Sequence, residues 1–248
     1  MKAMEAMEAM EAMEALNKVI QIMGIETGDA LVKKFTGYMD GVLEWNEKVN
    51  LTTITDPEEF VIKHFIDSVI CADYPEYAKA ERIIDVGTGA GFPGVPLAII
   101  SPEKNFFLMD SLNKRLKIID VLCEENNIKN VITIHARAEE LAKNKAHREQ
   151  YDLCVSRAVA NMSVLAEYCL PFIKVGGFLL AYKGPDAETE LAEAQNALMM
   201  LGGRVEEIRH GQLTEFGIDH KIAVIKKIKN TPSKFPRKAG TPAKEPLK

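Results

Sequence analysis

The sequence predicts an α/β protein with a mainly parallel sheet that carries helices on both of its faces. After Pro75, short apolar runs alternate with helical stretches, which is the pattern of repeated strand–helix units. A glycine-rich turn follows the first of these runs: residues 85–94 read Asp-Val-Gly-Thr-Gly-Ala-Gly-Phe-Pro-Gly. The chain has 248 residues, 47% of them hydrophobic and 27% charged, which suits one large globular domain with an appendage.

The chain begins with residues 1–15, which repeat Met-Glu-Ala almost without change. These residues are good helix formers, but a three-residue step advances about 300° around a helix of ~3.6 residues per turn. The methionines therefore drift around the helix and leave no single face for the core. We expect a low-complexity helical extension without a functional role.

Residues 16–75 form a predicted helical segment that precedes the core. Its amphipathic face is marked by apolar residues at spacings of four and three: Leu31, Phe35, Tyr38, Val42 and Trp45. Thr55 and Pro57 predict a capping box with proline in the first turn of a further helix. That helix carries His64, which we interpret as a partly buried, hydrogen-bonded histidine rather than a catalyst.

The predicted core spans residues 76–229 and contains seven strands. They are expected at residues 82–86, 105–110, 131–135, 151–156, 177–182, 204–210 and 221–228. The intervening helices are expected at residues 95–100, 114–126, 138–144, 162–173 and 187–201. Only residues 211–219 join the last two strands, which is too short for a helical crossover, so the last strand is expected to be antiparallel.

Residues 230–248 form a basic tail whose four prolines exclude a regular helix or a central strand. We expect the tail either to be flexible or to lie across the surface. Residues 226–248 hold eight basic residues and one acidic residue, so this part carries +7 and the rest of the chain −12, within a total of −5. The total alone argues against nucleic acid as a partner, but the segregated positive charge favours it.

Polar residues follow the carboxyl ends of the first strands, which is where open α/β sheets bind ligands. The glycine-rich turn follows the first strand, and Asp110 and Ser111 end the second. An acid about 20 residues after such a turn is placed to accept hydrogen bonds from ribose hydroxyls. Ala138 and Glu139 follow the third strand, and Arg157 ends the fourth.

The glycine-rich turn admits three interpretations. Gly89, Gly91 and Gly94 match the dinucleotide fingerprint G-x-G-x-x-G, which would bind NAD. The register Asp85-x-Gly87-x-Gly89 instead suits a cofactor without phosphate and favours S-adenosylmethionine, whose amino-acid part would meet the loop. A purely structural turn is the third interpretation, and the acid at the end of the second strand argues against it.

Three residues near these strand ends have competing interpretations. Phe92 either packs in the core or covers a bound cofactor. Glu139 is either a solvated residue of a first helical turn or a contact to adenine. The Arg157 guanidinium needs a partner at the end of a buried strand, and a ligand carboxylate, a structural acid or an RNA phosphate would each serve.

The cysteines and the apolar runs bear on the cellular compartment. Four cysteines, at positions 71, 123, 154 and 169, are widely spaced without a C-x-x-C pair, so we expect reduced, mostly packed thiols and no metal site. No apolar run approaches the ~20 residues of a membrane span, and no signal peptide is visible. We therefore expect a cytoplasmic protein without a membrane partner.

Taken together, the motifs resemble the bacterial small-subunit ribosomal RNA guanine-N7 methyltransferases, the family also called glucose-inhibited division protein B. Besides residues 85–94, the resemblance rests on Leu-Met-Asp-Ser-Leu-Asn-Lys-Arg at 108–115, Ala-Arg-Ala-Glu at 136–139, Val-Ser-Arg-Ala at 155–158 and Pro-Arg-Lys-Ala-Gly-Thr-Pro at 236–242. It covers residues 16–248 and leaves out only the Met-Glu-Ala repeat.

The resemblance implies a class I methyltransferase fold, S-adenosylmethionine as the cofactor, and a guanine N7 in the 530 loop of 16S rRNA as the acceptor. It implies cofactor contacts at several strand ends: Gly87, Gly89, Phe92, Asp110, Ser111, Leu112, Ala138, Glu139 and Arg157. It also places Lys234, Arg237 and Lys238 near RNA. The expected partner is 16S rRNA in the small subunit or its precursor, and we expect the enzyme to be a monomer.

The implied chemistry agrees with the residues present. Guanine N7 has a lone pair and no proton, so its in-line attack on a methyl group needs no general base, and no base–nucleophile pair stands out in the sequence. We therefore assign no catalytic base, and Arg157 is the best candidate for positioning substrate or cofactor. The competing functions are a methyltransferase for another RNA, a protein or a small molecule, an NAD-dependent oxidoreductase, and a non-catalytic RNA-binding module.

Overall fold

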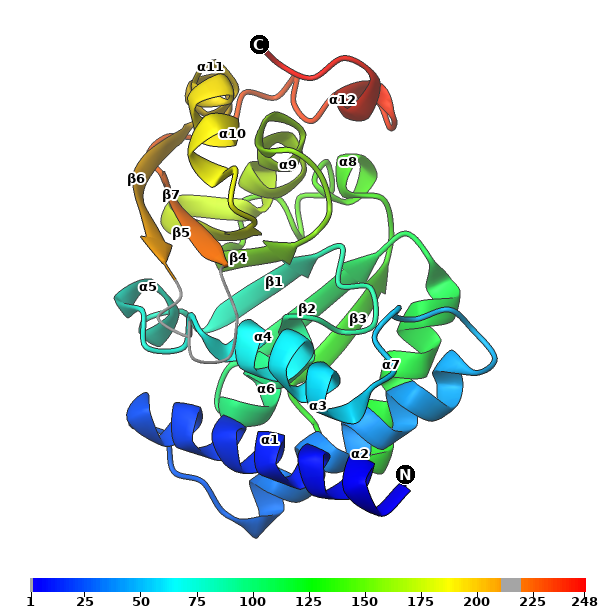
Figure 1. Cartoon of the computed structure of the whole chain (residues 1–248). Helices are drawn as coiled ribbons and strands as arrows, with labels where there is room; N and C mark the ends of the chain where they lie inside the picture. The colour runs from blue at the N-terminus through cyan, green and yellow to red at the C-terminus, as the bar shows by residue number, and fades with distance from the viewer. Residues whose placement is uncertain (1, 211–219) are drawn as a thin grey trace.

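The protein is built around one seven-stranded sheet with the strand order β3-β2-β1-β4-β5-β7-β6 (Figure 1). The computed structural model describes the backbone of residues 2–210 and 220–248 and the side chains of residues 10–210 and 220–248. The strands are β1 (Arg82–Val86), β2 (Asn105–Asp110), β3 (Val131–His135), β4 (Tyr151–Arg157), β5 (Ile173–Lys183), β6 (Gly203–His210) and β7 (Lys221–Lys227). Neighbouring strands are parallel except that β7 runs antiparallel to both β5 and β6, as predicted.

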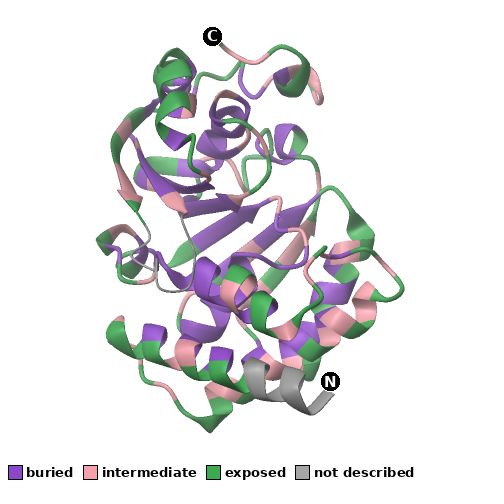
Figure 2. Cartoon of the chain, viewed as in Figure 1, coloured by how far each residue is buried: buried purple, intermediate pink, exposed green. Residues whose placement is uncertain are grey.

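Helices cover both faces of the sheet because side chains alternate along each strand. Ile83 of β1 faces the helices α1 (Lys2–Ile22), α2 (Asp29–Asn46), α6 (Gly94–Ile100) and α7 (Asn113–Glu125). Its neighbour Ile84 faces α8 (Ala138–Leu141), α9 (Met162–Cys169), α10 (Ala187–Glu193) and α11 (Gln195–Leu201). Buried residues concentrate on the central strands and on the helix faces that meet them (Figure 2).

The predicted strands and helices are confirmed, with differences at some ends. The helix predicted at 162–173 ends at Cys169 and continues as a short 3-10 turn, η2 (Leu170–Phe172). Pro171 lies in this turn, and a proline cannot continue an α-helix because it lacks an N–H group. The helix predicted at 187–201 is divided into α10 and α11 at Ala194. The link between β6 and β7, residues 211–219, lies outside the described residues.

The helical segment before the core contains α2 and a second, composite helix. The composite helix consists of α3 (Pro57–Phe60), a π-helical stretch η1 (Val61–Ile66) and α4 (Asp67–Val69), and α5 (Pro75–Ala78) follows it. Asp56 rather than Thr55 caps it, since the Asp56 side chain accepts a hydrogen bond from the Glu59 N–H at 2.8 Å. Proline occupies the first turn, as predicted.

The Met-Glu-Ala repeat departs from the expectation that it has no buried face. Helix α1 runs without a break across residues 15 and 16, and Ala12 and Met13 are buried. They lie on the same face as Leu16, Val19 and Ile20, because positions three, four and seven apart share one side of a helix. The last part of the repeat therefore joins the core, where α1 packs against α3 and η1.

The basic tail lies across the surface, which decides between the two predicted alternatives. Phe235 is buried among residues of the face that carries α9 and α11. A short helix, α12 (Thr241–Lys244), follows and packs against α9 (Figure 1). The prolines leave the tail no regular structure over most of its length, so it is fastened by side chains of the core instead.

Candidate functional site

The glycine-rich turn connects β1 to α6 in a conformation that glycine favours. Gly87 has a φ of +78°, and a β-carbon there would lie 2.5 Å from Val159 Cγ2. At Gly94, the first residue of α6, a β-carbon would lie 2.8 Å from Asp85 Oδ2. The two glycines therefore allow the helix and the turn to approach the end of the sheet closely.

Asp85, near the end of β1, holds this turn through hydrogen bonds. Its Oδ2 accepts hydrogen bonds from Thr88 Oγ1 at 2.7 Å and from the Gly94 N–H at 2.9 Å. Its Oδ1 is buried without a hydrogen-bond partner among the described residues. Complete burial raises the pKa of Asp85 from 3.8 to about 7, although these hydrogen bonds and the Arg157 charge oppose the shift.

Asp110, at the end of β2, ties the turn to the next strand. Its Oδ2 accepts the Gly89 N–H at 3.0 Å and its Oδ1 accepts the Leu112 N–H at 2.8 Å. A carboxylate offers about four lone-pair sites, so both oxygens can still accept from a ligand. This geometry leaves the predicted contact to ribose hydroxyls available.

A cavity of about 390 Å³ opens between the ends of β1, β2, β3 and β4, and we call it the glycine-loop cavity. It is lined by Val86, Gly87, Met109, Asp110, Ser111, Leu112, Arg115, Ala136, Arg137, Ala138, Glu139, Ala158, Val159, Tyr168, Gly240 and Ala243. The volume falls within the range typical of cofactor sites. Apolar walls with a few polar groups at strand ends suit a nucleoside, so the residues present fit the expected cofactor.

Glu139 is buried in the wall of this cavity, so its interpretation as a solvated residue is wrong. Its Oε1 accepts the Gly240 N–H of the tail at 2.8 Å. Gly240 and Ala243 themselves line the cavity, although they lie more than a hundred positions further along the chain. The tail is therefore one wall of the glycine-loop cavity.

A second cavity of about 400 Å³ lies beside the first, and we call it the Arg157 cavity. It is lined by Ile54, Lys63, His64, Asp67, Arg157, Ala158, Tyr182, Lys183, Gly184 and His220. Ala158 borders both cavities. The two cavities are therefore neighbours at the carboxyl end of β4, on either side of Ala158.

Arg157 has a structural acid as its partner, which is one of the three predicted alternatives. Its guanidinium forms a short ion pair with Asp67 and donates to the Lys63 carbonyl at 3.1 Å. The Asp67 side chain is 1% exposed and also accepts from His220. Burial alone would raise the pKa of Asp67, but the hydrogen bonds from His220 and Arg157 outweigh it and lower this pKa.

His64 is a hydrogen-bonded, partly buried histidine, as predicted. Its Nε2 lies 2.7 Å from Thr52 Oγ1, and its Nδ1 lies 3.3 Å from Arg157 Nη2. Because Arg157 can only donate, Nδ1 accepts and the ring is neutral. Burial, together with the Arg157 charge, lowers the pKa of His64 to about 3, so a protonated form has no role near neutral pH.

Phe92 packs in the core and is not among the lining residues of the glycine-loop cavity. Its ring stacks on His64 at 4.3 Å between centroids and meets Phe60 edge to face at 5.7 Å. The Arg157 guanidinium lies 5.6 Å from the Phe92 ring. The residue therefore supports the wall between the glycine-rich turn and the helical segment.

The nine residues expected at the cofactor divide into two groups. Six line the glycine-loop cavity: Gly87, Asp110, Ser111, Leu112, Ala138 and Glu139. The other three are not among its lining residues: Gly89 donates its N–H to Asp110 of the wall, Phe92 packs in the core, and Arg157 lines the neighbouring cavity. Tyr168 and Gly240 were missed as lining residues, since no local pattern in the sequence connects α9 or the tail to the strand ends.

The three residues expected at RNA also differ from one another. Lys234 and Lys238 are exposed. Arg237 is held by the buried Glu167, because its Nε and Nη2 donate to Glu167 at 3.0 and 2.7 Å. Arg237 is thus committed to a contact within the protein.

Comparison with known proteins identifies the family. The family described as GidB, rRNA small subunit methyltransferase G, matches residues 31–216. The chain is 46% identical to ribosomal RNA small subunit methyltransferase G of Clostridium novyi, over 93% of this chain and 95% of that protein. It is 49% identical to the protein of the same name from Alkaliphilus oremlandii, over 92% of this chain and 95% of that one.

The chain belongs to the rRNA small subunit methyltransferase G family. A solved 16S rRNA (adenine(1408)-N(1))-methyltransferase mutant from Catenulisporales acidiphilia has the same fold, with a TM-score of 0.52 and 16% identity over 63% of this chain and 90% of that one. The predicted class I methyltransferase fold is confirmed. The cofactor of this family member is S-adenosylmethionine, which the register of the glycine-rich turn favoured over NAD.

The described residues include neither a cluster of metal ligands nor a membrane-spanning helix. Within the described residues, no group of three or more His, Cys, Asp or Glu side chains is arranged to hold a metal ion. In the same part of the chain, no helix is both long and apolar enough to span a bilayer. The four cysteines are free thiols and all are buried, as predicted.

Proposed function

We propose that this family member methylates N7 of a guanine in the 530 loop of 16S rRNA. The observation that carries the proposal is the pair of adjoining cavities at the carboxyl ends of the strands, which share Ala158. The family relatives are named for small-subunit rRNA methylation. One cavity has the glycine-rich turn expected of a cofactor site, and the other is open for an acceptor base.

We assign the cofactor to the glycine-loop cavity. S-adenosylmethionine supplies a methyl group on a positively charged sulfur. We expect Asp110 to accept from ribose hydroxyls, and Ala138 and Glu139, which line the same cavity, to contact the adenine. Gly87 lines the same cavity, and we expect its backbone to meet the amino-acid part.

We assign the target guanine to the Arg157 cavity. The cationic groups of Lys63, Arg157 and Lys183 line this cavity, and Asp67 is the acid among its lining residues. Each of these cations has an acid partner, Glu59, Asp67 and Glu190 respectively, and the N–H groups that these pairs leave over suit the acceptor atoms of guanine. The base must be splayed out of its stack to enter, as in other enzymes that modify bases.

Two titratable groups that line the acceptor cavity, His64 and Asp67, are not suited to removing a proton. His64 is hydrogen-bonded on both ring nitrogens, and its pKa is lowered to about 3. Asp67 is engaged by Arg157 and His220. Guanine N7 carries no proton, so the protein needs only to bring N7 close to the methyl group and in line with the bond that breaks.

Lys234 and Lys238 of the tail are proposed as phosphate contacts because both are exposed. Arg237 was expected to act with them, but its guanidinium is bound to Glu167. We propose that the enzyme works as a monomer in the cytoplasm, on 16S rRNA in the small subunit or in its precursor.

The deciding experiment measures transfer of labelled methyl groups to 16S rRNA, to small subunits and to tRNA, followed by mapping of the modified base. Labelling of a 530-loop guanine at N7 is expected. Labelling of another base, or of tRNA alone, would favour a methyltransferase for a different RNA. No transfer to any RNA, with transfer to small molecules instead, would overturn the rRNA assignment.

A matched pair of glycine variants tests where the cofactor binds. Gly87→Asp places a side chain against Val159 at the cavity wall, so binding of S-adenosylmethionine in calorimetry should be lost. Gly176→Asp is the control, because Gly176 also has a positive φ but has open space around it at the other end of the sheet. Equal binding by both variants would contradict the assignment of this cavity.

A further inference from the structure

The C-terminal tail is fastened to the core at three places, and the last of them is at the cofactor site. The tail leaves β7 at Lys227 and returns over the loop that follows α8 (Figure 1). Along this path it contacts Arg148, then Glu167, then Glu139. Glu139 lines the glycine-loop cavity, Glu167 is followed by its lining residue Tyr168, and Arg148 lies in the loop after α8, whose first two residues also line it.

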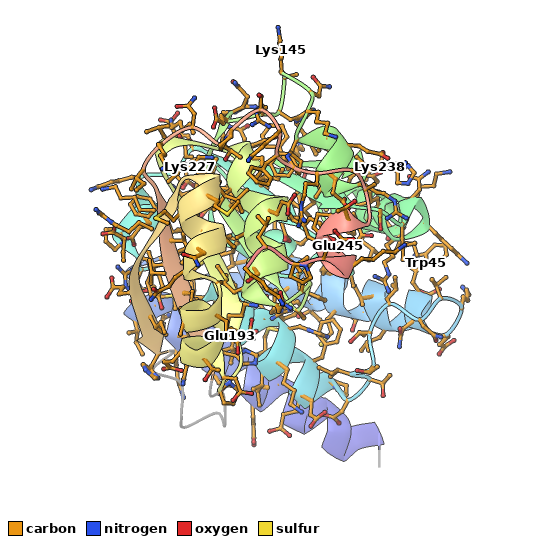
Figure 3. All side chains as sticks on the ribbon, turned by 90° about the horizontal axis from the view of Figure 1, so that it is seen from above. Trp45, Lys145, Glu193, Lys227, Lys238 and Glu245 are labelled. Atoms are coloured by element: carbon orange, nitrogen blue, oxygen red, sulfur yellow. The ribbon has the colours of Figure 1, made fainter. Side chains whose placement is uncertain are left out.

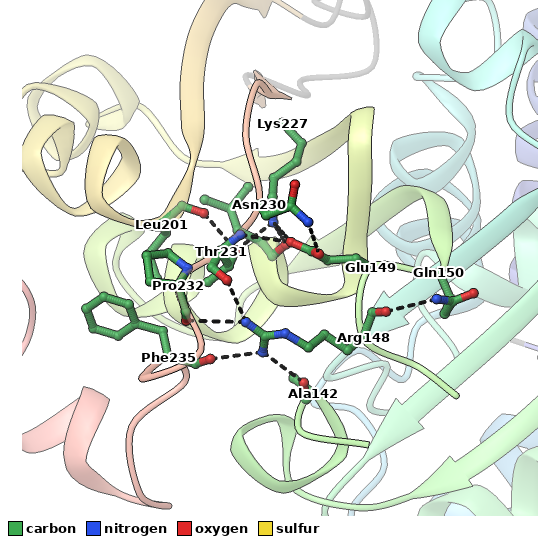
Figure 4. Close-up of polar contacts among 11 residues, drawn as sticks. Ala142, Arg148, Glu149, Gln150, Leu201, Lys227, Asn230, Thr231, Pro232 and Phe235 are labelled. Carbon is green, nitrogen blue, oxygen red and sulfur yellow. Dashed lines mark hydrogen bonds and ion pairs between the residues drawn. The ribbon is translucent and has the colours of Figure 1, made fainter. Parts of the chain in front are cut away.

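Arg148 makes the first fastening with four hydrogen bonds to carbonyl groups (Figure 4). Its Nη1 donates to Phe235 O at 2.9 Å and to Ala142 O at 3.1 Å. Its Nη2 donates to Thr231 O at 2.7 Å and to Pro232 O at 3.3 Å. One guanidinium thus holds three carbonyls of the tail together with the residue after α8.

Glu149 and Lys227 strengthen this first fastening. Glu149 accepts the Thr231 N–H and the Asn230 side-chain amide, each at 2.8 Å. Lys227 is fully buried, with its Nζ 2.6 Å from Thr231 Oγ1 and 3.4 Å from Glu149. Buried charges are kept only where they are paired, so this part of the tail has a defined position.

Arg237 makes the second fastening. Its Nε donates to both carboxylate oxygens of Glu167 and its Nη2 donates to Oε2, while its backbone N–H donates to Oε1 at 2.7 Å. Glu167 is fully buried in α9, and its neighbour Tyr168 lines the glycine-loop cavity. A bidentate pair of this kind fixes the orientation of the Arg237 guanidinium as well as its distance from the Glu167 carboxylate.

Gly240 makes the third contact, with Glu139. Its N–H donates to Glu139 Oε1 at 2.8 Å, and its φ of +82° turns the chain into α12. Gly240 and Ala243 then form part of the cavity wall. The position of Glu139, and the shape of the space beside it, therefore depend on where the tail is held.

We propose that the C-terminal tail is a positioning element of the cofactor site, with Arg237 as the residue that holds it in place. The tail closes one side of the glycine-loop cavity and holds the Glu139 carboxylate toward the adenine end. This proposal rests on the placement of the cofactor in that cavity. It assigns Arg237 to cofactor binding rather than to RNA contact.

The test is the affinity for S-adenosylmethionine measured by calorimetry in the absence of RNA. Arg237→Ala should weaken binding by about tenfold, because it removes the charge-assisted hydrogen bonds that hold the tail against the glycine-loop cavity. Arg237→Lys should recover part of the loss, since lysine restores the charge but not the two-pronged geometry. At saturating RNA, KM for the cofactor should rise while kcat stays within about twofold.

Arg209→Ala is the matched control. Arg209 makes a similar two-pronged pair with Glu76, at 2.8 and 3.1 Å, and its side chain is 20% exposed against 24% for Arg237. It lies on β6, away from the glycine-loop cavity. The Arg209→Ala substitution should lower the unfolding temperature without changing the affinity for the cofactor.

Hydrogen exchange on the unaltered protein gives a second test that does not depend on a variant folding. Amides of residues 237–244 should exchange more slowly when S-adenosylmethionine is bound. Unchanged exchange in this stretch, or cofactor affinity in Arg237→Ala equal to that of the unaltered protein, would overturn the proposal. Failure of the unaltered protein itself to bind the cofactor would instead overturn the assignment of the site.

Discussion

Around the glycine-loop cavity, three carboxylates each accept a hydrogen bond from a backbone N–H group. Asp85 accepts from Gly94, Asp110 from Gly89, and Glu139 from Gly240. Each of these donors is a glycine, so the chain can come close to the acid without a side chain in the way. The glycines of the motifs therefore let the backbone approach these acids, in addition to leaving room for a ligand.

The raised pKa of Asp85 makes a pH-dependent contribution to stability. The unfolded carboxyl titrates near 3.8 and the folded one near 7, so between these values only the folded state holds the proton. Stability should therefore fall with rising pH across this window, by at most about 1.4 kcal/mol per pH unit, and level off above pH 7. Asp85→Asn should remove this component, which urea unfolding at pH 5, 6, 7 and 8 would measure. Parallel pH profiles for the two proteins would contradict the assignment.

Asp110 should matter for cofactor binding through its two backbone contacts. In Asp110→Asn only one oxygen remains, so either the Gly89 or the Leu112 N–H loses its acceptor. We expect cofactor affinity to fall by about tenfold in calorimetry. Asp152→Asn is the control, since Asp152 accepts from the Glu81 and Arg82 N–H groups at the opposite end of β1. An equal loss in both variants would show a general effect on the sheet instead.

At the scale of the helices and strands, the sequence predicted an element correctly where neighbouring residues determine its position. The starts of β1, β2 and β3 agree with the prediction because short apolar runs and flanking turns define them. Pro171 ends its helix for an equally local reason, although the prediction ran past it. The partners of Arg157 and Glu139 could not be predicted, since Asp67 and Gly240 lie 90 and 101 positions away and only the fold brings them together.

The Arg157–Asp67 pair joins β4 to the helical segment before the core. The Arg157 side chain is 12% exposed and that of Asp67 is 1% exposed, so the pair is largely shielded from water. Asp67→Asn leaves the guanidinium without its counter-charge and should destabilise the protein by about 3 kcal/mol in urea unfolding. Glu206→Gln, which breaks the exposed pair with Arg204, should cost under about 1 kcal/mol. A small effect of Asp67→Asn would mean that the helical segment is held by its apolar contacts alone.

At the scale of the whole molecule, the basic tail lies at one end of the protein. The tail and α12 lie over α8 and α9 at the top of the view, and α1 and α2 lie at the bottom (Figure 1). Seen from that end, Lys145 extends away from the body of the protein and Lys238 lies near α12 (Figure 3). A protein with a net charge of −5 can therefore still present a basic face to RNA.

The salt dependence of RNA binding should report how many phosphates this face contacts. Each lost contact is expected to reduce the slope of log affinity against log salt by about 0.7 to 0.9, because fewer counterions are released. In Lys234→Ala with Lys238→Ala the slope should therefore become shallower by about 1.4 to 1.8, and binding at low salt should weaken. The control carries Lys18→Ala and Lys33→Ala, which remove two exposed lysines from α1 and α2 at the other end of the molecule. Both double variants lose the same net charge, so only a contact made by the tail separates them. Titration of 16S rRNA at several salt concentrations makes the comparison, and identical slopes for the two would place the RNA on another face.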